Sequence, residues 1–206
     1  MKNVRFARAL CAFALIAGTG GVALAQQQPD VQETQADPLQ PLPDDAQTQA
    51  DPVQADVYDA PGAEAAMAEM ADRFGISELA PGQYRWADSI PASGPTKIVI
   101  SLTDQLAFVY RADELIGVAT ISSGKKDHET PTGVFPILAK EKDHKSKKFD
   151  DAPMPYMQRL NEYGVALHGG NVPGYPASHG CVRLPMAFAA RLFALTTTGT
   201  DVIIEA

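Results

Sequence analysis

The sequence is poor in cysteine and histidine. Its 206 residues include two cysteines, four histidines and one tryptophan. Cys11 lies in the N-terminal segment, so Cys181 is the only cysteine beyond residue 25. A single cysteine excludes a framework of intramolecular disulfides, and such a residue is either a free reactive thiol or paired with another molecule.

Long apolar runs are also missing beyond the N-terminus. Residues 1–25 begin with three Lys or Arg residues, continue with an apolar run and end in Ala-Leu-Ala at 23–25. This order is typical of a secretory signal peptide, and we expect cleavage after Ala25 and export. The apolar run is too short to span a bilayer, so we expect no membrane span after cleavage.

Basic residues are absent from the segment that follows. Residues 26–63 carry eight Asp or Glu and no Lys or Arg, and the whole chain has a net charge of −8. Without a basic patch, the sequence predicts no nucleic-acid partner. Residues 26–60, rich in Gln, Pro and Asp, are predicted to form a disordered acidic spacer.

Residues 61–96 are predicted to be a helix and a connecting segment that packs on the domain that follows. The stretch GAEAAMAEMADRF at 62–74 favours a helix. Its expected buried face comprises Ala65, Met67 or Ala68, Ala71 and Phe74. We expect Trp86 to be the packing residue of the connecting segment.

Residues 97–206 are predicted to form the main domain. Short β-branched or aromatic segments separated by turn residues predict strands in antiparallel hairpins; these are 97–102, 105–111, 116–122, 133–139, 163–170 and a last strand within 196–206. A helix is expected at 185–195, with Met186, Ala189, Ala190 and Phe193 on its buried face. The predicted fold is mostly β (α+β minor), a two-sheet β-sandwich-like core with one or two short helices.

The scarce residues gather in one stretch, ALHGGNVPGYPASHGCVRLP at 166–185. A cysteine acts as thiolate, and a nearby imidazole can accept its proton, which makes Cys181 and His168 candidates for nucleophile and base. Pro185 begins the predicted helix, whose N-terminus would favour a thiolate. The alternatives are a zinc site of two histidines and the cysteine, a structural His179, and an Arg183 that is surface charge or binds a substrate carboxylate.

This stretch closely resembles the signature of the L,D-transpeptidase catalytic domain, the YkuD-type family. The signature is an upstream His-Gly and the block Ser178-His179-Gly180-Cys181-Val182-Arg183. TPTGVFPI at 130–137 and MPYMQRL at 154–160 extend the resemblance, which covers 97–206. His168 and Ser178 are closer in sequence than in many relatives, so we expect a short loop over the site.

The resemblance implies a role for each residue of the signature. Cys181 would be the nucleophile and His168 the general base, oriented by the carbonyl of Gly169. Backbone N–H groups near Gly180 and Cys181 would form the oxyanion hole. Ser178, His179 and Arg183 would shape the substrate site, and neither a metal nor a cofactor is expected.

The activity implied is that of a peptidoglycan L,D-transpeptidase in the periplasm. Cys181 would attack the carbonyl of the third residue, a diaminoacid, of a tetrapeptide stem and release D-Ala. The acyl group would pass to an amine of another stem, of a free D-amino acid or of an envelope protein, and carbapenems would react at the same cysteine. The alternatives are an L,D-carboxypeptidase or amidase that uses water, and an inactive wall-binding module.

Overall fold

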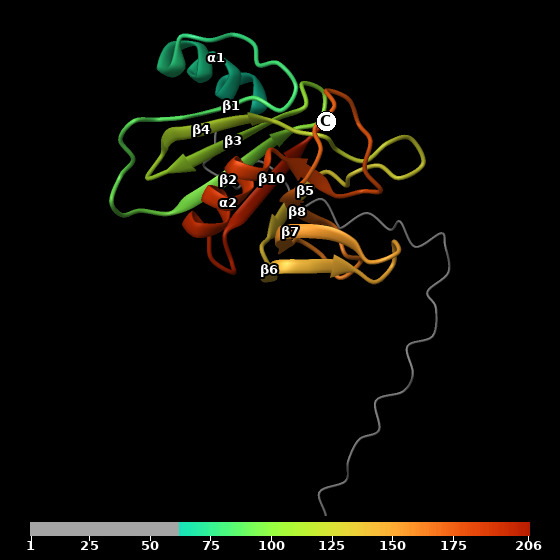
Figure 1. Cartoon of the computed structure of the whole chain (residues 1–206). Coiled ribbons are helices and arrows are strands. Elements are labelled where there is room, and N and C mark those ends of the chain that lie inside the picture. The colour runs from blue at the N-terminus through green and yellow to red at the C-terminus, as the bar shows by residue number, and fades with distance from the viewer. Residues whose placement is uncertain (1–61) are drawn as a thin grey trace, which may run out of the picture. The chain divides into compact units, whose positions relative to one another are not determined.

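Two β-sheets and two short helices make up the part of the chain that the structure, a computed structural model, describes, residues 62–206 (Figure 1). The predicted signal peptide and the whole of the predicted spacer lie outside the described residues. Within residues 62–206, no helix is both long and apolar enough to cross a membrane. The mostly-β, two-sheet prediction is therefore confirmed for this part of the chain.

The larger sheet has six strands in the order β1-β4-β3-β2-β10-β5. The strands are β1 (Tyr84–Trp86), β2 (Thr96–Ser101), β3 (Leu106–Arg111), β4 (Glu114–Thr120), β5 (Gly133–Pro136) and β10 (Asp201–Glu205). Neighbours are antiparallel except for β10 and β2, which pair in parallel from Asp201 opposite Lys97 to Glu205 opposite Ser101. The last strand of the chain thus lies between β2 and the edge strand β5.

The smaller sheet has four strands in the order β6-β7-β8-β9. These are β6 (Ala139–Ser146), β7 (Ala152–Arg159), β8 (Ala166–Gly169) and β9 (Val182–Leu184). β6 and β7 form a long hairpin, whereas β8 and β9 pair in parallel. The expected antiparallel hairpins are therefore only part of the topology, since each sheet contains one parallel pair.

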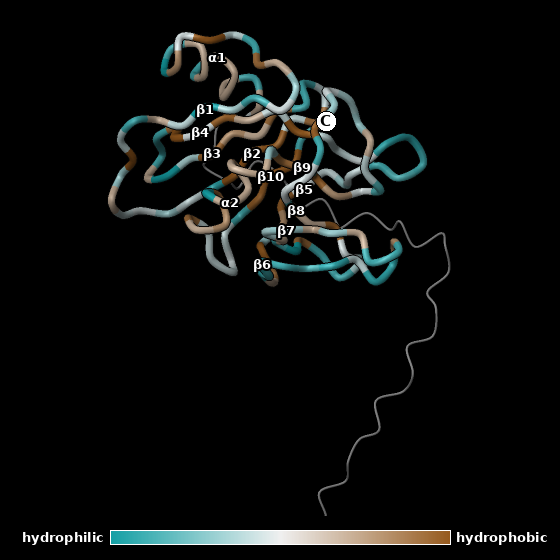
Figure 2. The backbone as a smooth tube through the Cα atoms, viewed as in Figure 1, coloured by the Kyte–Doolittle hydropathy of each residue, from teal (hydrophilic) through white to brown (hydrophobic). Residues whose placement is uncertain are grey.

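Both faces of the larger sheet are covered, which explains why its central strands are almost continuously apolar. Ile98 and Ile100 belong to the cluster that also contains side chains of β8, β9 and helix α2 (Met186–Leu195), whereas Val99 belongs to the cluster under helix α1 (Ala63–Phe74). Figure 2 shows hydrophobic residues in the interior strands and hydrophilic residues along β6. Each fully buried large apolar side chain contributes about 1.5–3 kcal/mol to stability.

Helix α1 forms where predicted but buries a different face. Its buried residues are Ala63, Ala66 and Met70, while Ala65, Ala68 and Ala71 are exposed and Met67 and Phe74 are half-buried. A helix rich in alanine and methionine offers several apolar faces, so polar anchors set its rotation. The Glu69 carboxylate accepts hydrogen bonds from the Tyr110 hydroxyl at 3.0 Å and from the Leu115 amide at 3.3 Å.

Helix α2 also differs from the prediction in its buried face. Phe188, Ala189 and Leu192 are buried, Ala190 and Phe193 are half-buried, and Met186 is 50% exposed. The helix is apolar on nearly all sides, so periodicity does not select one face. The contact with Trp86 selects the buried face, because the Trp86 ring stacks on Phe188 at a centroid distance of 4.5 Å.

Candidate active site

The candidate nucleophile and base come from the parallel pair of the smaller sheet. Leu167 pairs with Val182 and His168 with Arg183, which places Cys181 beside Ala166 at the start of β9. Alternate residues of a strand point to the same face, so Cys181 and His168 project from one face of this sheet. Val182 and Leu184 point the other way and are fully buried, which anchors the strand in the core.

The His168 ring is held in one tautomer. Its Nδ1 atom lies 3.0 Å from the Gly169 carbonyl oxygen, and a carbonyl only accepts, so Nδ1 carries the hydrogen. The Nε2 atom then has a free lone pair. Burial lowers the pKa of His168, and the positive charges of Arg183 and His144 lower it further, against an opposing effect of the Gly169 bond. The ring is therefore a neutral base at neutral pH.

The Cys181 thiol is partly buried among Met154 and Met157 of β7 and Ala166 of β8. Its Sγ lies 3.6 Å from the Gly164 carbonyl oxygen. Burial raises the pKa of the thiol, while a backbone hydrogen bond from Ala166 and the charge of Arg183 lower it in part. The thiol is thus protonated in the resting protein.

The expected thiolate at a helix N-terminus is not what the structure contains. β9 separates Cys181 from helix α2, which begins only at Met186. The dipole of a helix acts mainly within its first turn, so it offers little to a residue a whole strand away. A nucleophilic role for Cys181 would therefore require a base.

Ser178 and Gly180 shape the turn that carries the cysteine. The buried Ser178 hydroxyl donates to the Cys181 carbonyl oxygen at 2.5 Å and accepts the Gly180 N–H at 3.1 Å. Gly180 has a φ of 108°, which L side chains rarely adopt. The Ser178 side chain is thus turned into the protein, where it holds the cysteine turn, and the Gly180 N–H is engaged by the Ser178 hydroxyl. The expected roles of Ser178 at the substrate site and of Gly180 at the oxyanion hole stay predictions.

The backbone N–H of Cys181 is the remaining candidate for an oxyanion donor. It makes no hydrogen bond to a loop or side-chain acceptor within residues 62–206. A donor next to the nucleophile is well placed for a charge that develops on the attacked carbonyl.

Thr130 is a site residue that sequence analysis missed. Its buried hydroxyl donates to the Gly180 carbonyl oxygen at 3.0 Å and accepts the Gly124 N–H at 2.8 Å. It ties the loop 124–130 to the cysteine turn across 50 residues of sequence. The stretch TPTG at 130–133 was the only signal, and it indicated a turn and not this contact.

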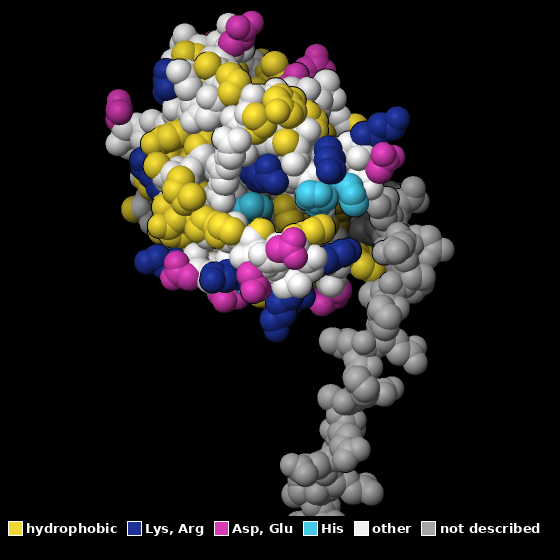
Figure 3. Space-filling model, turned by 45° about the vertical axis from the view of Figure 1, so that its right-hand side comes forward, with side chains coloured by type: hydrophobic (Ala, Val, Ile, Leu, Met, Phe, Trp, Pro, Cys, Tyr) yellow, Lys and Arg dark blue, Asp and Glu magenta, His cyan; other side chains and the backbone are white. Residues whose placement is uncertain are grey.

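His179 and Arg183 lie on the open side of the site. The exposed His179 ring packs against His128 at a centroid distance of 4.9 Å and stacks on Phe149 at 4.7 Å. Sequence analysis named neither of these two partners, and neither lies in the signature. Arg183 is half-buried beside Gly170 and makes no ion pair with any residue of 62–206. Figure 3 shows histidine side chains gathered with Lys and Arg side chains on this face.

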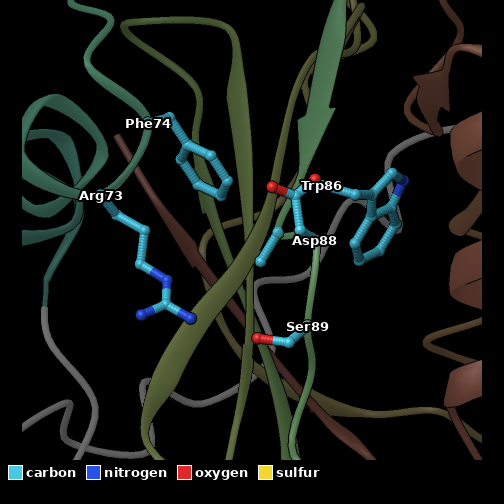
Figure 4. Close-up of a pocket in the computed structure, with 6 residues that line it drawn as sticks. Arg73, Phe74, Trp86, Asp88 and Ser89 are labelled. Atoms are coloured by element: carbon cyan, nitrogen blue, oxygen red, sulfur yellow. The ribbon is translucent and has the colours of Figure 1, made fainter.

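No group of three or more His, Cys, Asp or Glu side chains in residues 62–206 is close enough to hold a metal ion. A cavity of about 400 Å³ does exist elsewhere, lined by Arg73, Phe74 and residues 86–89. Figure 4 shows the Trp86 indole directed away from Arg73 and Phe74. None of the residues of the signature lines this cavity.

Comparison with known proteins identifies the family. The family model of the L,D-transpeptidase catalytic domain, YkuD, matches residues 95–204, which is more than half of the chain. The chain belongs to the YkuD family of L,D-transpeptidase catalytic domains. The family resemblance seen in the sequence is thereby confirmed.

Individual relatives agree with this membership. A curated Bacillus licheniformis protein assigned as an L,D-transpeptidase, YkuD, is 28% identical over 123 residues, covering 55% of this chain and 68% of the relative. A crystal structure of an L,D-transpeptidase from Mycobacterium tuberculosis superposes with a TM-score of 0.52 at 20% identity, covering 54% of this chain and 57% of that one.

A second Mycobacterium tuberculosis enzyme, L,D-transpeptidase 3 in complex with a faropenem-derived adduct, has a TM-score of 0.50 at 19% identity. It covers 54% of this chain and 60% of that one, so the chain spans somewhat more than half the length of these two structures. At this identity the two structures establish the shared fold.

Proposed function

We propose that the protein is a peptidoglycan L,D-transpeptidase that uses Cys181 as nucleophile. The observation that carries this proposal is the pairing of β8 with β9, which directs Cys181 and His168 to one face of the smaller sheet. His168 is held there as a neutral base by the Gly169 carbonyl. Family membership supports the reaction class, acyl transfer on peptide stems.

The first half-reaction forms a thioester. His168 Nε2 accepts the thiol proton as Sγ attacks the carbonyl of the third, diaminoacid residue of a tetrapeptide stem. The amide of Cys181 donates to the developing oxyanion. The tetrahedral intermediate then breaks its C–N bond, and the leaving D-Ala amine takes the proton from His168.

The second half-reaction returns the thiol. An acceptor amine attacks the thioester, loses a proton to Nε2, and displaces Sγ, which recovers that proton. The acceptor is the side-chain amine of another stem, a free D-amino acid or a lysine of an envelope protein. These give a 3–3 cross-link, an exchanged terminal residue or an anchored protein.

A resting site in which Cys181 and His168 are both uncharged suits this mechanism. Burial raises the thiol pKa of Cys181 and lowers the pKa of His168, so the neutral pair is favoured until a substrate arrives. A protonated thiol is also less open to oxidation than a thiolate, which matters in an exported protein. The signal-peptide pattern of residues 1–25 supports a periplasmic location.

Intact-mass spectrometry tests the proposal. The mature chain, residues 26–206, and its Cys181→Ala variant would be incubated with a purified tetrapeptide muropeptide. We expect an acyl adduct on the unmodified chain alone, followed by a 3–3 cross-linked dimer. An adduct that yields only tripeptide would identify a hydrolase, and a folded chain that forms no adduct would contradict catalysis.

A penem or carbapenem offers a second acylation probe. Faropenem gave an adduct with the mycobacterial enzyme named above, and we expect Cys181 to be acylated in the same way. Equal labelling of Cys181→Ala would show that the probe reacts elsewhere.

A further inference from the structure

The loop 124–130 is fixed to the cysteine turn although it lies outside the family signature. The Lys125 N–H donates to the Ser178 carbonyl oxygen at 3.1 Å, and Thr130 joins the loop to Gly180. Gly124 is packed so tightly that a Cβ atom there would lie 2.0 Å from the His128 carbonyl oxygen. The backbone of this loop is therefore held in a fixed position relative to the turn that carries Cys181.

The His179 ring marks the border between this loop and the β6–β7 hairpin. His128 packs its ring edge against His179 at 4.9 Å, and Phe149, from the hairpin turn, stacks on it with an interplanar angle of 27°. His179 is two residues before Cys181 and exposed. Its ring is thus presented to solvent beside the nucleophile in a supported orientation.

Basic side chains surround the His179 ring. Partial burial lowers the pKa of His179, and the charges of Lys125, His128 and Arg183 lower it further, with no acidic residue acting against them. Lys125 and Arg183 form no ion pair with any residue of 62–206. The Lys125 and Arg183 cations thus have no counter-charge among these residues, and a bound anion would supply one.

Glu129, an acidic residue of the same loop, is not among the charges that act on His179. The Glu129 carboxylate accepts the Asp127 N–H at 3.0 Å and its charge interacts with Lys126 and His128. The charge of Lys126 therefore acts on Glu129, whereas the charge of Lys125 acts on His179. The two adjacent lysines form a matched pair for experiment, because both are exposed and only the charge of Lys125 acts on His179.

We propose that Lys125, His128 and His179 form a carboxylate-binding subsite beside Cys181 that receives a carboxylate of the peptide stem. The ammonium supplies a compact positive charge, and each imidazole supplies an N–H donor. The subsite makes the enzyme selective for stems with free carboxylates over stems whose carboxylates are amidated. This proposal rests on the proposed transpeptidase function and adds residues and a substrate class to it.

Matched stem peptides test the subsite. Three tetrapeptide stems would be compared, with all carboxylates free, with the non-terminal carboxylates converted to carboxamides, and with only the terminal one converted. The acylation rate of Cys181 would be followed by intact mass in the mature chain, Lys125→Gln and Lys126→Gln. We expect Lys125→Gln to lose about fivefold in rate on the free-acid stem, the scale of one exposed charge contact.

The decisive quantity is the change in preference between variants. Comparing ratios across variants cancels any effect of amidation on the reactivity of the leaving amine. We expect the preference for the free acid to fall in Lys125→Gln and to stay unchanged in Lys126→Gln, and added salt to weaken it. If amidation of one carboxylate abolishes the difference in rate between the mature chain and Lys125→Gln, that carboxylate is the one bound.

Failure of the subsite and failure of the enzyme give different results. Equal acylation by all three stems, or equal losses in the two lysine variants, would overturn the subsite and leave the transpeptidase intact. No acylation by any stem, with Cys181 still reacting with iodoacetamide, would overturn the proposed function and the subsite with it.

Discussion

The Nδ1 atom of His168 donates a hydrogen bond to the carbonyl oxygen of Gly169, the next residue in the chain, at 3.0 Å. The bond needs no third side chain to orient the base. His168 and Gly169 are the last two residues of the buried strand β8, and Gly169 is packed against the Met186 side chain, whose sulfur would lie 2.8 Å from a Cβ there. The base is thus positioned by backbone geometry.

His168→Ala should slow acylation of Cys181 by about 100-fold or more, because the thiol of the resting protein is protonated and needs a base. Adduct formation with a tetrapeptide stem, followed by intact mass, measures the rate. Circular dichroism serves as the control for folding. An unchanged rate in a folded variant would remove His168 from the mechanism.

The pH dependence of acylation follows from the lowered pKa of His168. Only the neutral imidazole accepts a proton, and its folded pKa lies below the ordinary value of 6.5. The acylation rate should therefore hold as pH falls to 6.5 and be lost only below it, as the ring becomes protonated. A rate profile from pH 8 to about pH 5 checks this, and a midpoint at or above 6.5 would contradict the buried, neutral base.

Thr130→Val should destabilise the protein by about 2–3 kcal/mol, since an isosteric change leaves the buried Gly124 N–H and the Gly180 carbonyl without their partner. Urea unfolding measures the loss. Thr130→Ser keeps the hydroxyl and should recover most of it. Equal unfolding midpoints for Thr130→Val and the unmodified chain would show that the loop is held by other contacts.

Gly124→Ala should be more disruptive than a typical glycine substitution, because the new Cβ would lie 2.0 Å from the His128 carbonyl oxygen. We expect a loss of about 3 kcal/mol or more, the scale of forced backbone movement. Gly199→Ala is the matched control: it has a φ of 84° but nothing within 4 Å of the new atom. Thermal unfolding that ranks Gly199→Ala as the worse variant would argue against the steric account.

Lys140→Met should weaken the attachment of the hairpin to helix α2. The Lys140 ammonium donates to the carbonyl oxygens of Phe193 and Thr196, both at 2.6 Å, and lies 4.3 Å from the Phe193 ring centroid. A cation at a helix C-terminus stabilises by about 0.3–2 kcal/mol, so we expect a loss on that scale. Lys142 lies on the same strand and is exposed, so Lys142→Met should have no effect on unfolding. Equal losses of stability in the two variants would mean that the removal of charge, and not the contact with the helix, is responsible.

The strands that sequence analysis located best are those whose environment leaves a clear pattern. Residues 97–102 and 105–111 were predicted as strands, and the structure has β2 and β3 within one residue of those limits. Both are apolar because both faces of their sheet are covered. β6, with the sequence AKEKDHKS, was missed because it is an exposed edge strand whose charged residues carry no β pattern.

The residues of the candidate site also differ in how clearly the sequence marks them. Cys181 and His168 stood out because reactive residue types are scarce and lie within one stretch of sequence. Thr130, His128 and Phe149 did not, because common residue types acquire a role only when distant segments meet. The assigned faces of helices α1 and α2 were wrong for a related reason: both helices are apolar on several sides, and partners elsewhere in the chain choose among them.

The sequence by itself determined the family, the class of fold and the choice of Cys181 and His168 as the candidate pair, because these depend on local patterns of side chains. Tertiary structure alone decided the protonation of that pair, the inward orientation of Ser178 and the gathering of Lys125, His128 and Phe149 around His179. Burial and electrostatic potential are sums over all neighbours in space, and the pairing of strands far apart in the chain determines which neighbours those are.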